Sequence, residues 1–380
     1  MCSSDLLTVG LQERAYPIHI GSGILPRLGA YLRARLQSLR YAVISDDQVA
    51  ALYGGKVLAA LQAAGLTGEL FTFPAGEAGK RLGTIEALAG HMLQKGFDRS
   101  HAILALGGGV SGDMAGFLAA IYMRGIPFVQ VPTSLLAQVD SSVGGKTGVD
   151  IALGKNILGA FYQPRLVLID TELLQTLPHD ELLAGLGEVI KYGVSLDAGF
   201  FHYLAERREQ ILALDAGCLR HVIRLCCTLK AGVVAADERE SGLRRVLNFG
   251  HTIGHAVEAA SGFTLLHGFA VAIGMVAVAD LAVRTGFAQP ALREEIAGLL
   301  SAYGLPTAIP KTIAAERIAA FVQADKKMAG QRLFWVMPSA LGKVTVTDQV
   351  DARAFLQILG LRRHSDGPSQ RMRSRTQEAT

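Results

Sequence analysis

Three histidines lie close together in the stretch LNFGHTIGHAVEAASGFTLLH, residues 247–267. His251 and His255 are four positions apart, so on a helix they share one face. His267 follows Gly262, a typical helix stop, and is expected to come from a loop. Two helical imidazoles and a third from a loop can supply neutral nitrogen ligands to Zn²⁺ or a similar metal. A single histidine is more often a core or capping residue, but only 10 histidines occur in 380 residues. The cluster therefore favours metal or substrate binding.

Glu188 and Lys191, in GLGEVIKYG, are the candidate carboxylate ligand and a neighbouring cation. An isolated Glu and Lys three residues apart on a helix usually form a surface pair. Here the segment is otherwise apolar, so we expect both side chains to point inward. Glu188 would then face the metal, and Lys191 a substrate oxygen. Further polar residues lead into the histidine stretch and could line the same cavity: Lys230, Arg244 and Asn248.

A glycine turn, with Gly107, Gly108, Gly109 and Gly112, lies between an apolar run and a helical pattern. Glycine lets backbone N–H groups approach an anion, and the following helix adds its positive end. The spacing is not GxGxxG, so a tight turn without a ligand stays open as the alternative. Asp113, just past the turn, could hold a ribose hydroxyl or cap the helix, and it favours a nucleotide.

The run 132–156 is rich in Ser, Thr and Gly and holds Lys146 and Lys155 between glycines and polar residues. Lysines on such loops can reach phosphate oxygens. GGKT resembles the end of a P-loop, but the upstream glycine spacing and the strand context are wrong, so an NTPase is excluded. With the other polar residues of this region the two lysines predict a substrate pocket: Asn156, Asp140 and Arg124.

The elements that must position these residues follow two patterns. In the first, short apolar runs alternate with helical patterns, which is the βαβ signature of a parallel sheet with ligands at the carboxyl ends of its strands. The predicted strands are Tyr41–Ser45, Glu69–Phe73, Ala102–Leu106, Phe128–Val131 and Leu166–Ile169, and the predicted helices are Gln48–Ala64, Leu82–Lys95 and Met114–Tyr122.

The second pattern is helical throughout, from Pro178 to about Leu300. A short strand pair, Leu333–Met337 and Val344–Val346, and a last helix, Asp351–Leu359, are expected near the end. We therefore predict a sheet domain followed by a helical domain, with the boundary near Thr176.

Composition is that of a globular protein, with 50% hydrophobic and 18% charged residues. The net charge is +4, but residues 361–380 hold five Arg against Asp366 and Glu378, so the body is nearly neutral. A nucleic-acid partner would rest on that basic tail alone, and a polar tail is more often a disordered terminus. Neither a nucleic-acid nor a membrane partner is expected.

The four cysteines include no CxxC pair, so we expect neither a thiolate zinc site nor a disulfide framework, which fits a reducing cytoplasm. The N-terminus lacks a basic region followed by an apolar run and so predicts no signal peptide. Phe263–Ala279 has no formal charge but contains His267 and two Gly, which indicates a buried loop and helix.

From about Val9 to Val346 the chain resembles the 3-dehydroquinate synthases, a family of sugar-phosphate cyclases. The resemblance is carried by GGGVSGDMAGFLAAIYMRG, the run 132–156, TLPHDELLAGLGEVIKYG, LRRVLNFGHTIGHAVE and HGFAVAIGM. It implies an NAD-binding Rossmann-like α/β domain with a parallel sheet (1–176) and an all-α metal-binding domain (177–360), with the active site between them. Residues 361–380 lie outside the resemblance.

The resemblance also implies roles for single residues. It places Zn²⁺ or Co²⁺ on Glu188, His251 and His267, and moves His255 from the metal to the substrate. The other substrate-contacting positions are Asp140, Lys146, Asn156, Lys191, Lys230, Arg244 and Asn248, joined by Arg124 and by one of Lys326 and Lys327. In the family the arginine that matches Arg124 reaches in from a partner subunit, so a homodimer is implied.

The implied NAD-binding residues fall in several separate segments. They are Asp46; Ala75, Gly76, Glu77, Ala78, Gly79 and Lys80; Gly109, Val110, Ser111, Gly112 and Asp113; Thr133 and Ser134; Lys146 and Lys155; and Leu173, Leu174, Gln175 and Thr176.

Three positions depart from the family pattern. Ser134 replaces the second Thr of PTTL and keeps a hydroxyl. Asp150 stands where Asn usually precedes the GKN turn. Phe269 stands where Glu usually follows HG, which affects the surroundings of the metal site and not its ligands.

The activity implied is conversion of 3-deoxy-D-arabino-heptulosonate 7-phosphate, a phosphorylated sugar acid, to 3-dehydroquinate in the shikimate pathway. NAD would be used without net redox change, through oxidation at C5, loss of phosphate, re-reduction, ring opening and aldol closure. The alternatives are another cyclase such as 2-deoxy-scyllo-inosose synthase, a metal-dependent polyol dehydrogenase, and a non-catalytic scaffold that uses the basic tail.

Overall fold

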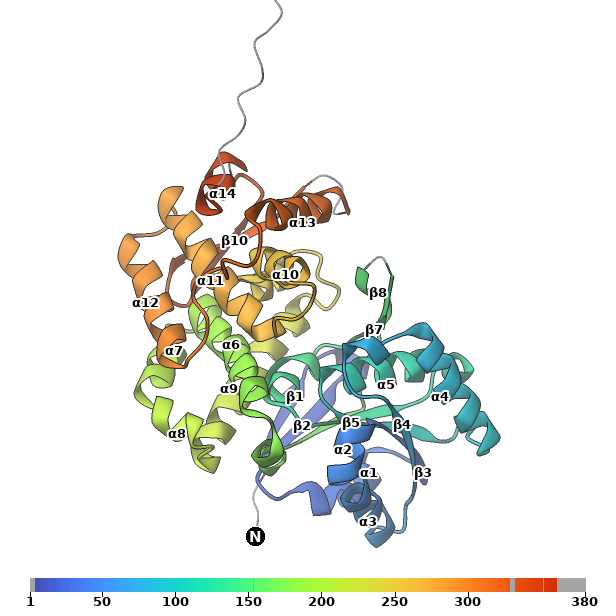
Figure 1. Ribbon diagram of the computed structural model, residues 1–380. Coiled ribbons are helices and arrows are strands. Elements are labelled where there is room, and N and C mark those ends of the chain that lie inside the picture. The colour runs from blue at the N-terminus through green and yellow to red at the C-terminus, as the bar shows by residue number, and fades with distance from the viewer. Residues whose placement is uncertain (1–3, 153, 329–331, 351, 361–380) are drawn as a thin grey trace, which may run out of the picture.

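A computed structural model describes residues 4–152, 154–328, 332–350 and 352–360 (Figure 1). The basic tail, 361–380, lies outside the described residues. A seven-stranded sheet with the order β1-β2-β9-β6-β5-β3-β4 forms one half of the molecule. Only the β1–β2 pair is antiparallel. The strands are β1 (Asp5–Val9), β2 (Tyr16–Gly21), β3 (Arg40–Asp46), β4 (Thr67–Phe73), β5 (Ala102–Gly107), β6 (Phe128–Pro132) and β9 (Leu166–Asp170).

The central strands are buried on both faces. In β3, Tyr41 and Val43 belong to one hydrophobic cluster, and Ala42 and Ile44 belong to another on the opposite face. This alternation follows from the two-residue period of a strand, and helices on both faces explain why the strands are apolar throughout. The covering helices are α1 (Leu28–Arg35), α2 (Asp47–Val49), α3 (Gly55–Ala63), α4 (Leu82–Gln94) and α5 (Gly109–Ile121).

Short turns of 3-10 or π-helix connect these elements. They are η1 (Gln12–Arg14), η2 (Leu25–Arg27), η3 (Ala50–Gly54), η4 (Glu77–Gly79), η5 (Tyr122–Arg124), η6 (Ala137–Ser141), η7 (Thr171–Thr176) and η8 (Leu243–Asn248). All five predicted strands are confirmed. The helix predicted over Gln48–Ala64 is interrupted by the π-turn η3, and the one predicted from Met114 begins five residues earlier, in the glycine turn.

The loop expected over residues 132–156 is instead largely structured, and this expectation was wrong. It contains η6 and the first strand of a hairpin, β7 (Lys146–Ile151) and β8 (Gly154–Phe161). Two glycines of this hairpin are required by the pairing of its strands. A Cβ on Gly159 would lie 2.3 Å from the Thr147 carbonyl oxygen, and one on Gly148 would lie 2.8 Å from that of Leu158. The antiparallel pair β1 and β2 was also not predicted.

The other half is helical, as expected, and carries the predicted strand pair. The helices are α6 (His179–Leu196), α7 (Ala198–Glu206), α8 (Arg208–Leu212), α9 (Ala216–Ala236), α10 (His251–Ala260), α11 (His267–Arg284), α12 (Pro290–Ala302), α13 (Ala315–Met328) and α14 (Ala352–Ile358), and the hairpin is β10 (Trp335–Ala340) with β11 (Lys343–Thr347).

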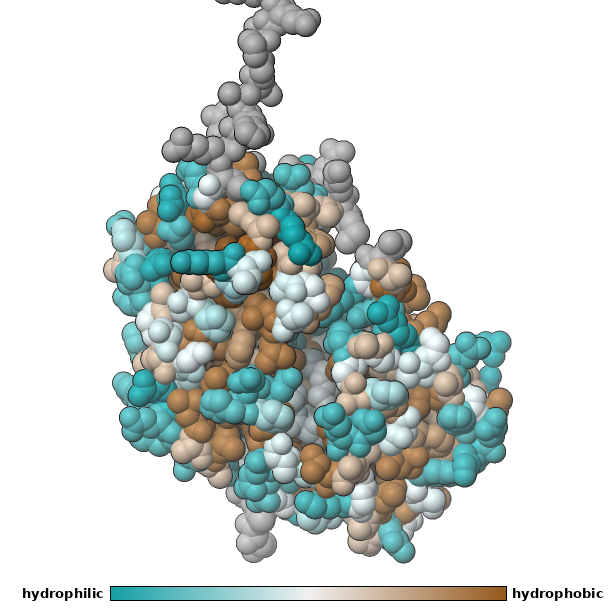
Figure 2. Space-filling view, in the orientation of Figure 1, coloured by the Kyte–Doolittle hydropathy of each residue, from teal (hydrophilic) through white to brown (hydrophobic). Residues whose placement is uncertain are grey.

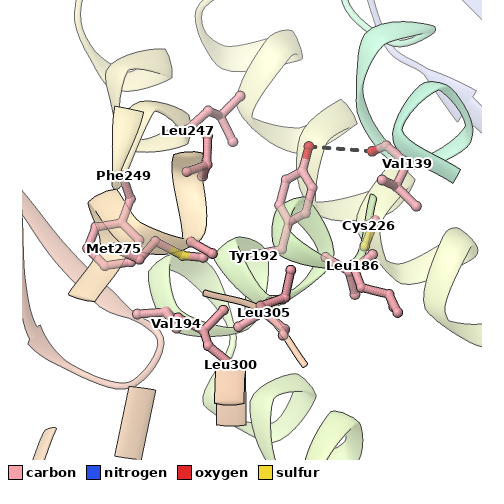
Figure 3. Close-up of a cluster of buried hydrophobic side chains, with 14 of the residues drawn as sticks. Val139, Leu186, Tyr192, Val194, Cys226, Leu247, Phe249, Met275, Leu300 and Leu305 are labelled. Atoms are coloured by element: carbon pink, nitrogen blue, oxygen red, sulfur yellow. Dashed lines mark hydrogen bonds between the residues drawn. The ribbon is translucent and has the colours of Figure 1, made fainter. Parts of the chain in front are cut away.

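One hydrophobic cluster joins the two halves. It contains Ile18 and Ile169 of the sheet together with Leu186 of α6 and Met275 of α11. Figure 3 shows part of this cluster, where the Tyr192 hydroxyl donates a hydrogen bond of 3.4 Å to the Val139 carbonyl of η6. The division near Thr176 stays a prediction, since this cluster includes residues from both sides of it.

Helix α11 is long and apolar enough to cross a membrane, and among the described helices it alone passes that test. In the fold, 67% of its most apolar window is buried, as for the core helix of a soluble protein. Figure 2 shows hydrophilic residues over both halves on this face, with hydrophobic residues in separate groups. The buried position agrees with the loop and helix expected from Phe263 to Ala279.

Candidate active site

Glu188 and the three histidines meet where α6, α10 and α11 pack together. Glu188 Oε1 lies 3.4 Å from His267 Nε2 and 3.6 Å from His251 Nε2. One ring nitrogen from each of His251, His255 and His267 lies within 4.8 Å of the others. His267 is the first residue of α11, directly after the loop that precedes it. The structure therefore brings together one carboxylate and three imidazoles.

Two glycines permit this approach of the helices. A Cβ on Gly268 would lie 1.9 Å from the Ala184 carbonyl oxygen of α6. A Cβ on Gly274 would lie 2.0 Å from the Gly250 carbonyl oxygen, just before α10. Any larger residue at either position would push α11 away from its neighbours. The short distance from Glu188 to His267 therefore depends on backbone contact between helices.

The chemistry of these donors fits a divalent metal. Glu188 is buried, yet neither carboxylate oxygen makes a hydrogen bond with a described residue, although Lys191 Nζ lies 2.5 Å from Oε2. A buried oxygen without a hydrogen bond needs an explanation, and a metal ion supplies one. Burial alone would raise the pKa of Glu188, but the Lys191 ammonium holds it well below its usual value. Burial lowers the pKa of His251, which keeps that imidazole neutral and able to bind metal.

Two buried lysines flank a carboxylate next to the histidines. Asp140, in η6, has Oδ2 at 3.3 Å from Lys191 Nζ and its backbone oxygen at 2.9 Å from Lys230 Nζ. Lys230 also pairs with Asp140 Oδ1. Burial lowers the pKa of Lys230 to about 7, a perturbation typical of functional sites. These cations can meet substrate oxygens, and Asp140 fixes their positions.

A second polar group lies at the end of α9. Arg244 is buried and donates to the backbone oxygens of Glu238, at 2.5 Å, and Gly144, at 3.2 Å. Glu240 accepts a hydrogen bond of 2.7 Å from Asn248 Nδ2 and pairs with Lys146. The hairpin residue Lys146 is thereby tied to the helical half.

The predicted NAD-binding segments follow the carboxyl ends of β3, β4, β5, β6 and β9. The chain runs from β3 out to β4 and then returns to β5 on the other side of β3, so the topological switch lies between β3 and β5. That is where open α/β sheets bind nucleotides. Asp46 and Ser111 flank this point, and the Ser111 hydroxyl donates to Asp46 Oδ2 at 3.1 Å.

Lys80 is buried between the loop after β4 and the hairpin. Its Nζ donates to Asp113 Oδ2 at 2.7 Å and to Asn156 Oδ1 at 2.6 Å. Asp150 Oδ1 accepts from the Asn156 backbone N–H at 2.7 Å. Asn156 has a φ of 54°, which Asn tolerates better than most residues. Asp150 thus supplies an acceptor that holds the β7–β8 turn, as the Oδ1 of the usual Asn could also do.

Several predicted residues lie apart from these networks. Arg124 is exposed, with a φ of 69°, and makes no hydrogen bond or ion pair with a described side chain. The side chains of Leu173 and Leu174 belong to the core, so only their backbone could meet a cofactor. The side chains of Lys326 and Lys327 lie outside those described.

Two carboxylates of the site were missed by sequence reasoning. Glu240 lies in a charged loop, DERESG, and gave no signal that separates it from solvated residues. Glu258 follows His255 by three positions on α10 and lies on the histidine face, which could have identified it. Two cavities, of about 640 and 480 Å³, open elsewhere on the helical half and contain none of the site residues.

Comparison with protein families gives two matches. The model described as "3-dehydroquinate synthase N-terminal" matches residues 70–184, and "3-dehydroquinate synthase C-terminal" matches residues 185–328.

Curated relatives match over almost the whole chain. A 3-dehydroquinate synthase of Rhodospirillum rubrum is 49% identical over 364 residues, which covers 94% of each chain. One of Symbiobacterium thermophilum is 49% identical over 347 residues, covering 91% of this chain and 97% of the relative.

Solved structures of related cyclases have the same fold. A 2-deoxy-scyllo-inosose synthase complexed with carbaglucose-6-phosphate, NAD⁺ and Co²⁺ has a TM-score of 0.86 at 26% identity, covering 93% of this chain and 99% of that one. A 2-epi-5-epi-valiolone synthase from Streptomyces hygroscopicus with NAD⁺ and Zn²⁺ has a TM-score of 0.84 at 28% identity, covering 92% and 97%. A probable glycerol dehydrogenase from Sinorhizobium meliloti, at 18% identity and a TM-score of 0.62, covers 89% and 95% and shares the fold alone.

Proposed function

The chain belongs to the 3-dehydroquinate synthase family, and from this premise we propose that it converts 3-deoxy-D-arabino-heptulosonate 7-phosphate to 3-dehydroquinate and phosphate. The observation that carries the proposal is the buried Glu188 facing His251 and His267, with a set of lysines beside them. The proposed changes on the substrate are oxidation at C5, β-elimination of phosphate, re-reduction, ring opening and intramolecular aldol closure.

Glu188, His251 and His267 are the proposed metal ligands, for Zn²⁺ or Co²⁺. A divalent metal here would lower the pKa of a substrate hydroxyl and polarise the ketone formed from it. His255 lies beside these ligands but is solvent-accessible, and we assign it to the substrate. Partial removal from water, followed by the neighbouring His267, lowers the pKa of His255, so this imidazole is neutral at neutral pH and can accept a proton.

The sheet half, residues 1–176, is the proposed NAD-binding domain. NAD⁺ would accept a hydride from the substrate alcohol and return it later, so no net redox change results. The N–H groups that begin α5, after Gly108, can bind the pyrophosphate, and Asp113 or Asp46 can meet ribose hydroxyls. Lys80 and Lys155 add positive charge at the same edge.

The remaining cations hold the substrate. Lys191 and Lys230 are buried and point their ammonium groups at Asp140, so a substrate oxygen can bind both without large rearrangement. Lys146, Asn156, Arg244 and Asn248 are assigned to the phosphorylated end and the hydroxyls. Positioned cations favour phosphate departure because they stabilise the charge that develops on the leaving group.

A homodimer in the cytoplasm is the proposed assembly, with Arg124 reaching the active site of the partner. Arg124 is exposed at the end of α5, next to Ile121, which is 47% exposed. On the neighbouring strand β8, Ile157 and Phe161 are also exposed. Exposed large apolar side chains on α5 and β8, with an exposed arginine just past α5, support a protein interface.

Offering three substrates to the purified protein tests the function. We expect phosphate release with heptulosonate phosphate, dependence on NAD⁺, and loss of turnover with a chelator. Release from glucose 6-phosphate would instead favour 2-deoxy-scyllo-inosose synthase, the relative with a TM-score of 0.86. Release from sedoheptulose 7-phosphate would indicate a third cyclase. Net build-up of NADH with an unphosphorylated alcohol would contradict all three.

A further inference from the structure

One carboxylate touches both the metal site and the nucleotide half. Glu258 lies on α10, seven residues after His251, and its side chain is 7% exposed. Its Oε2 lies 3.0 Å from His267 Nδ1, and its Oε1 accepts a hydrogen bond of 2.8 Å from Lys155 Nζ. Both oxygens are used, and the two partners come from different halves of the molecule.

We propose that Glu258 is a positioning residue that orients His267 for the metal and couples the metal site to the cofactor side through Lys155. The coupling rests on the proposed function, because that function assigns His267 to the metal and Lys155 to NAD. Glu258 itself touches neither the substrate nor the reacting atoms.

The contact with His267 determines which ring nitrogen is free. An N–H at Nδ1 satisfies the Glu258 carboxylate, so the lone pair of Nε2 points to the side where Glu188 Oε1 lies, at 3.4 Å. A carboxylate behind a ligand histidine fixes its tautomer and orientation and raises its basicity.

The contact with Lys155 extends the connection to the hairpin. Lys155 is on β8 and also lies 3.6 Å from Glu77 Oε1, in the loop after β4. Its ammonium lies 4.5 Å from the centre of the Phe263 ring, just past α10. In Figure 1 the hairpin rises from the sheet half alongside α10. A shift of Lys155 toward a bound nucleotide would therefore change the charge balance of the carboxylate that holds His267.

Reciprocal binding measurements on the full chain test this. Co²⁺ would be titrated against a chelator, with and without NAD⁺, for the wild type and for Glu258→Gln. We expect the variant to bind Co²⁺ about 10–100-fold more weakly, with an altered Co²⁺ absorption spectrum. NAD⁺ should change the Co²⁺ affinity of the wild type by at least about fivefold, and this effect should disappear in the variant.

Two further variants make the result decisive. Lys155 contacts none of the proposed metal ligands, so a changed Co²⁺ affinity in Lys155→Met reports coupling. This variant decides the matter if Glu258→Gln does not fold. Glu69→Gln is the matched control. Glu69 is on β4 and pairs with Arg40 and Lys95, so its substitution should leave Co²⁺ binding unchanged.

Unchanged Co²⁺ affinity in a folded Glu258→Gln would overturn the positioning role. Unchanged affinity in Lys155→Met, or no effect of NAD⁺ on the wild type, would overturn the coupling. No Co²⁺ binding by the wild type would instead refute the proposed function. These binding measurements use no substrate, so a failure of the role given to Glu258 can be distinguished from a failure of the proposed function.

Discussion

His251 and His255 are one helical turn apart but have different surroundings. His251 Nδ1 lies 3.1 Å from the Phe249 carbonyl oxygen, which leaves Nε2 facing Glu188. His255 is exposed and makes no hydrogen bond with a described residue. The first imidazole is thus held in the orientation of a ligand, whereas the second is free to meet the substrate.

Substituting each of these histidines by Gln should separate the two roles. His251→Gln should lose most of its bound metal and nearly all turnover. His255→Gln should retain about one metal per chain but lose about 10²–10⁴-fold in kcat, as for removal of a proton-transfer group. Metal analysis after dialysis, with kcat measured in parallel, checks both. Full metal content and activity in His251→Gln would contradict the ligand assignment.

The loop after α9 shows how an element positions a substrate group. Asp237 accepts hydrogen bonds from the backbone N–H groups of Ser241, at 2.8 Å, Gly242, at 2.7 Å, and Arg244, at 3.0 Å. These bonds close the turn that places Arg244 against Gly144. The N–H of Arg244, followed by that of Gly242, holds the pKa of Asp237 below its usual value.

Asp237→Asn should therefore lower both thermal stability and substrate affinity. A carboxyl whose pKa is depressed by folding stabilises the protein above its unfolded pKa of about 3.9, and this stabilisation is lost as the pH falls further. The difference in Tm between wild type and variant should be a few degrees at pH 6 and should shrink toward pH 3. Asp215→Ala, which removes the N-terminal cap of α9, is the control. It should lower Tm without raising KM, and an unchanged KM in Asp237→Asn would contradict the positioning of Arg244.

At the level of the whole molecule, the halves share one core, and the site draws residues from both. Lys146 and Lys155 cross from the hairpin to Glu240 and Glu258 of the helical half. Arg124 is exposed and makes no hydrogen bond or ion pair with a described side chain, which is consistent with service to a partner subunit.

Complementation between two inactive variants tests that arrangement. Arg124→Ala lacks the group offered to the partner, and Glu188→Gln lacks a group of its own site. Random mixing after subunit exchange should give about a quarter of wild-type activity, because half of the dimers are mixed and each has one intact site. Mixing Glu188→Gln with His251→Gln, both defective in their own sites, should give none. Activity no greater than the sum of the separate variants would place Arg124 in its own subunit.

The sequence alone was sufficient for the fold class. Strands such as Ala102–Leu106 are uniformly apolar because helices cover both faces of the sheet, and that pattern is local. Glu188 could be identified from the sequence because its segment is otherwise apolar. A charged side chain in such a helix is expected to point inward and to need a partner there. The hairpin β7–β8 was missed because its glycines serve a close approach of two backbones, which no local propensity reports.

What the sequence by itself determined was therefore the layout of elements and the residue types of the proposed site. Only the tertiary structure decided that Glu240 belongs beside it, that Glu258 meets both His267 and Lys155, and that Lys80 joins Asp113 to Asn156. These contacts join residues on different elements, and the one between Glu258 and His267 depends on the close approach of α11 to α6 and α10 at Gly268 and Gly274. A side chain of three or four carbons finds its partner only after the backbones are placed, and that placement depends on packing across the whole chain.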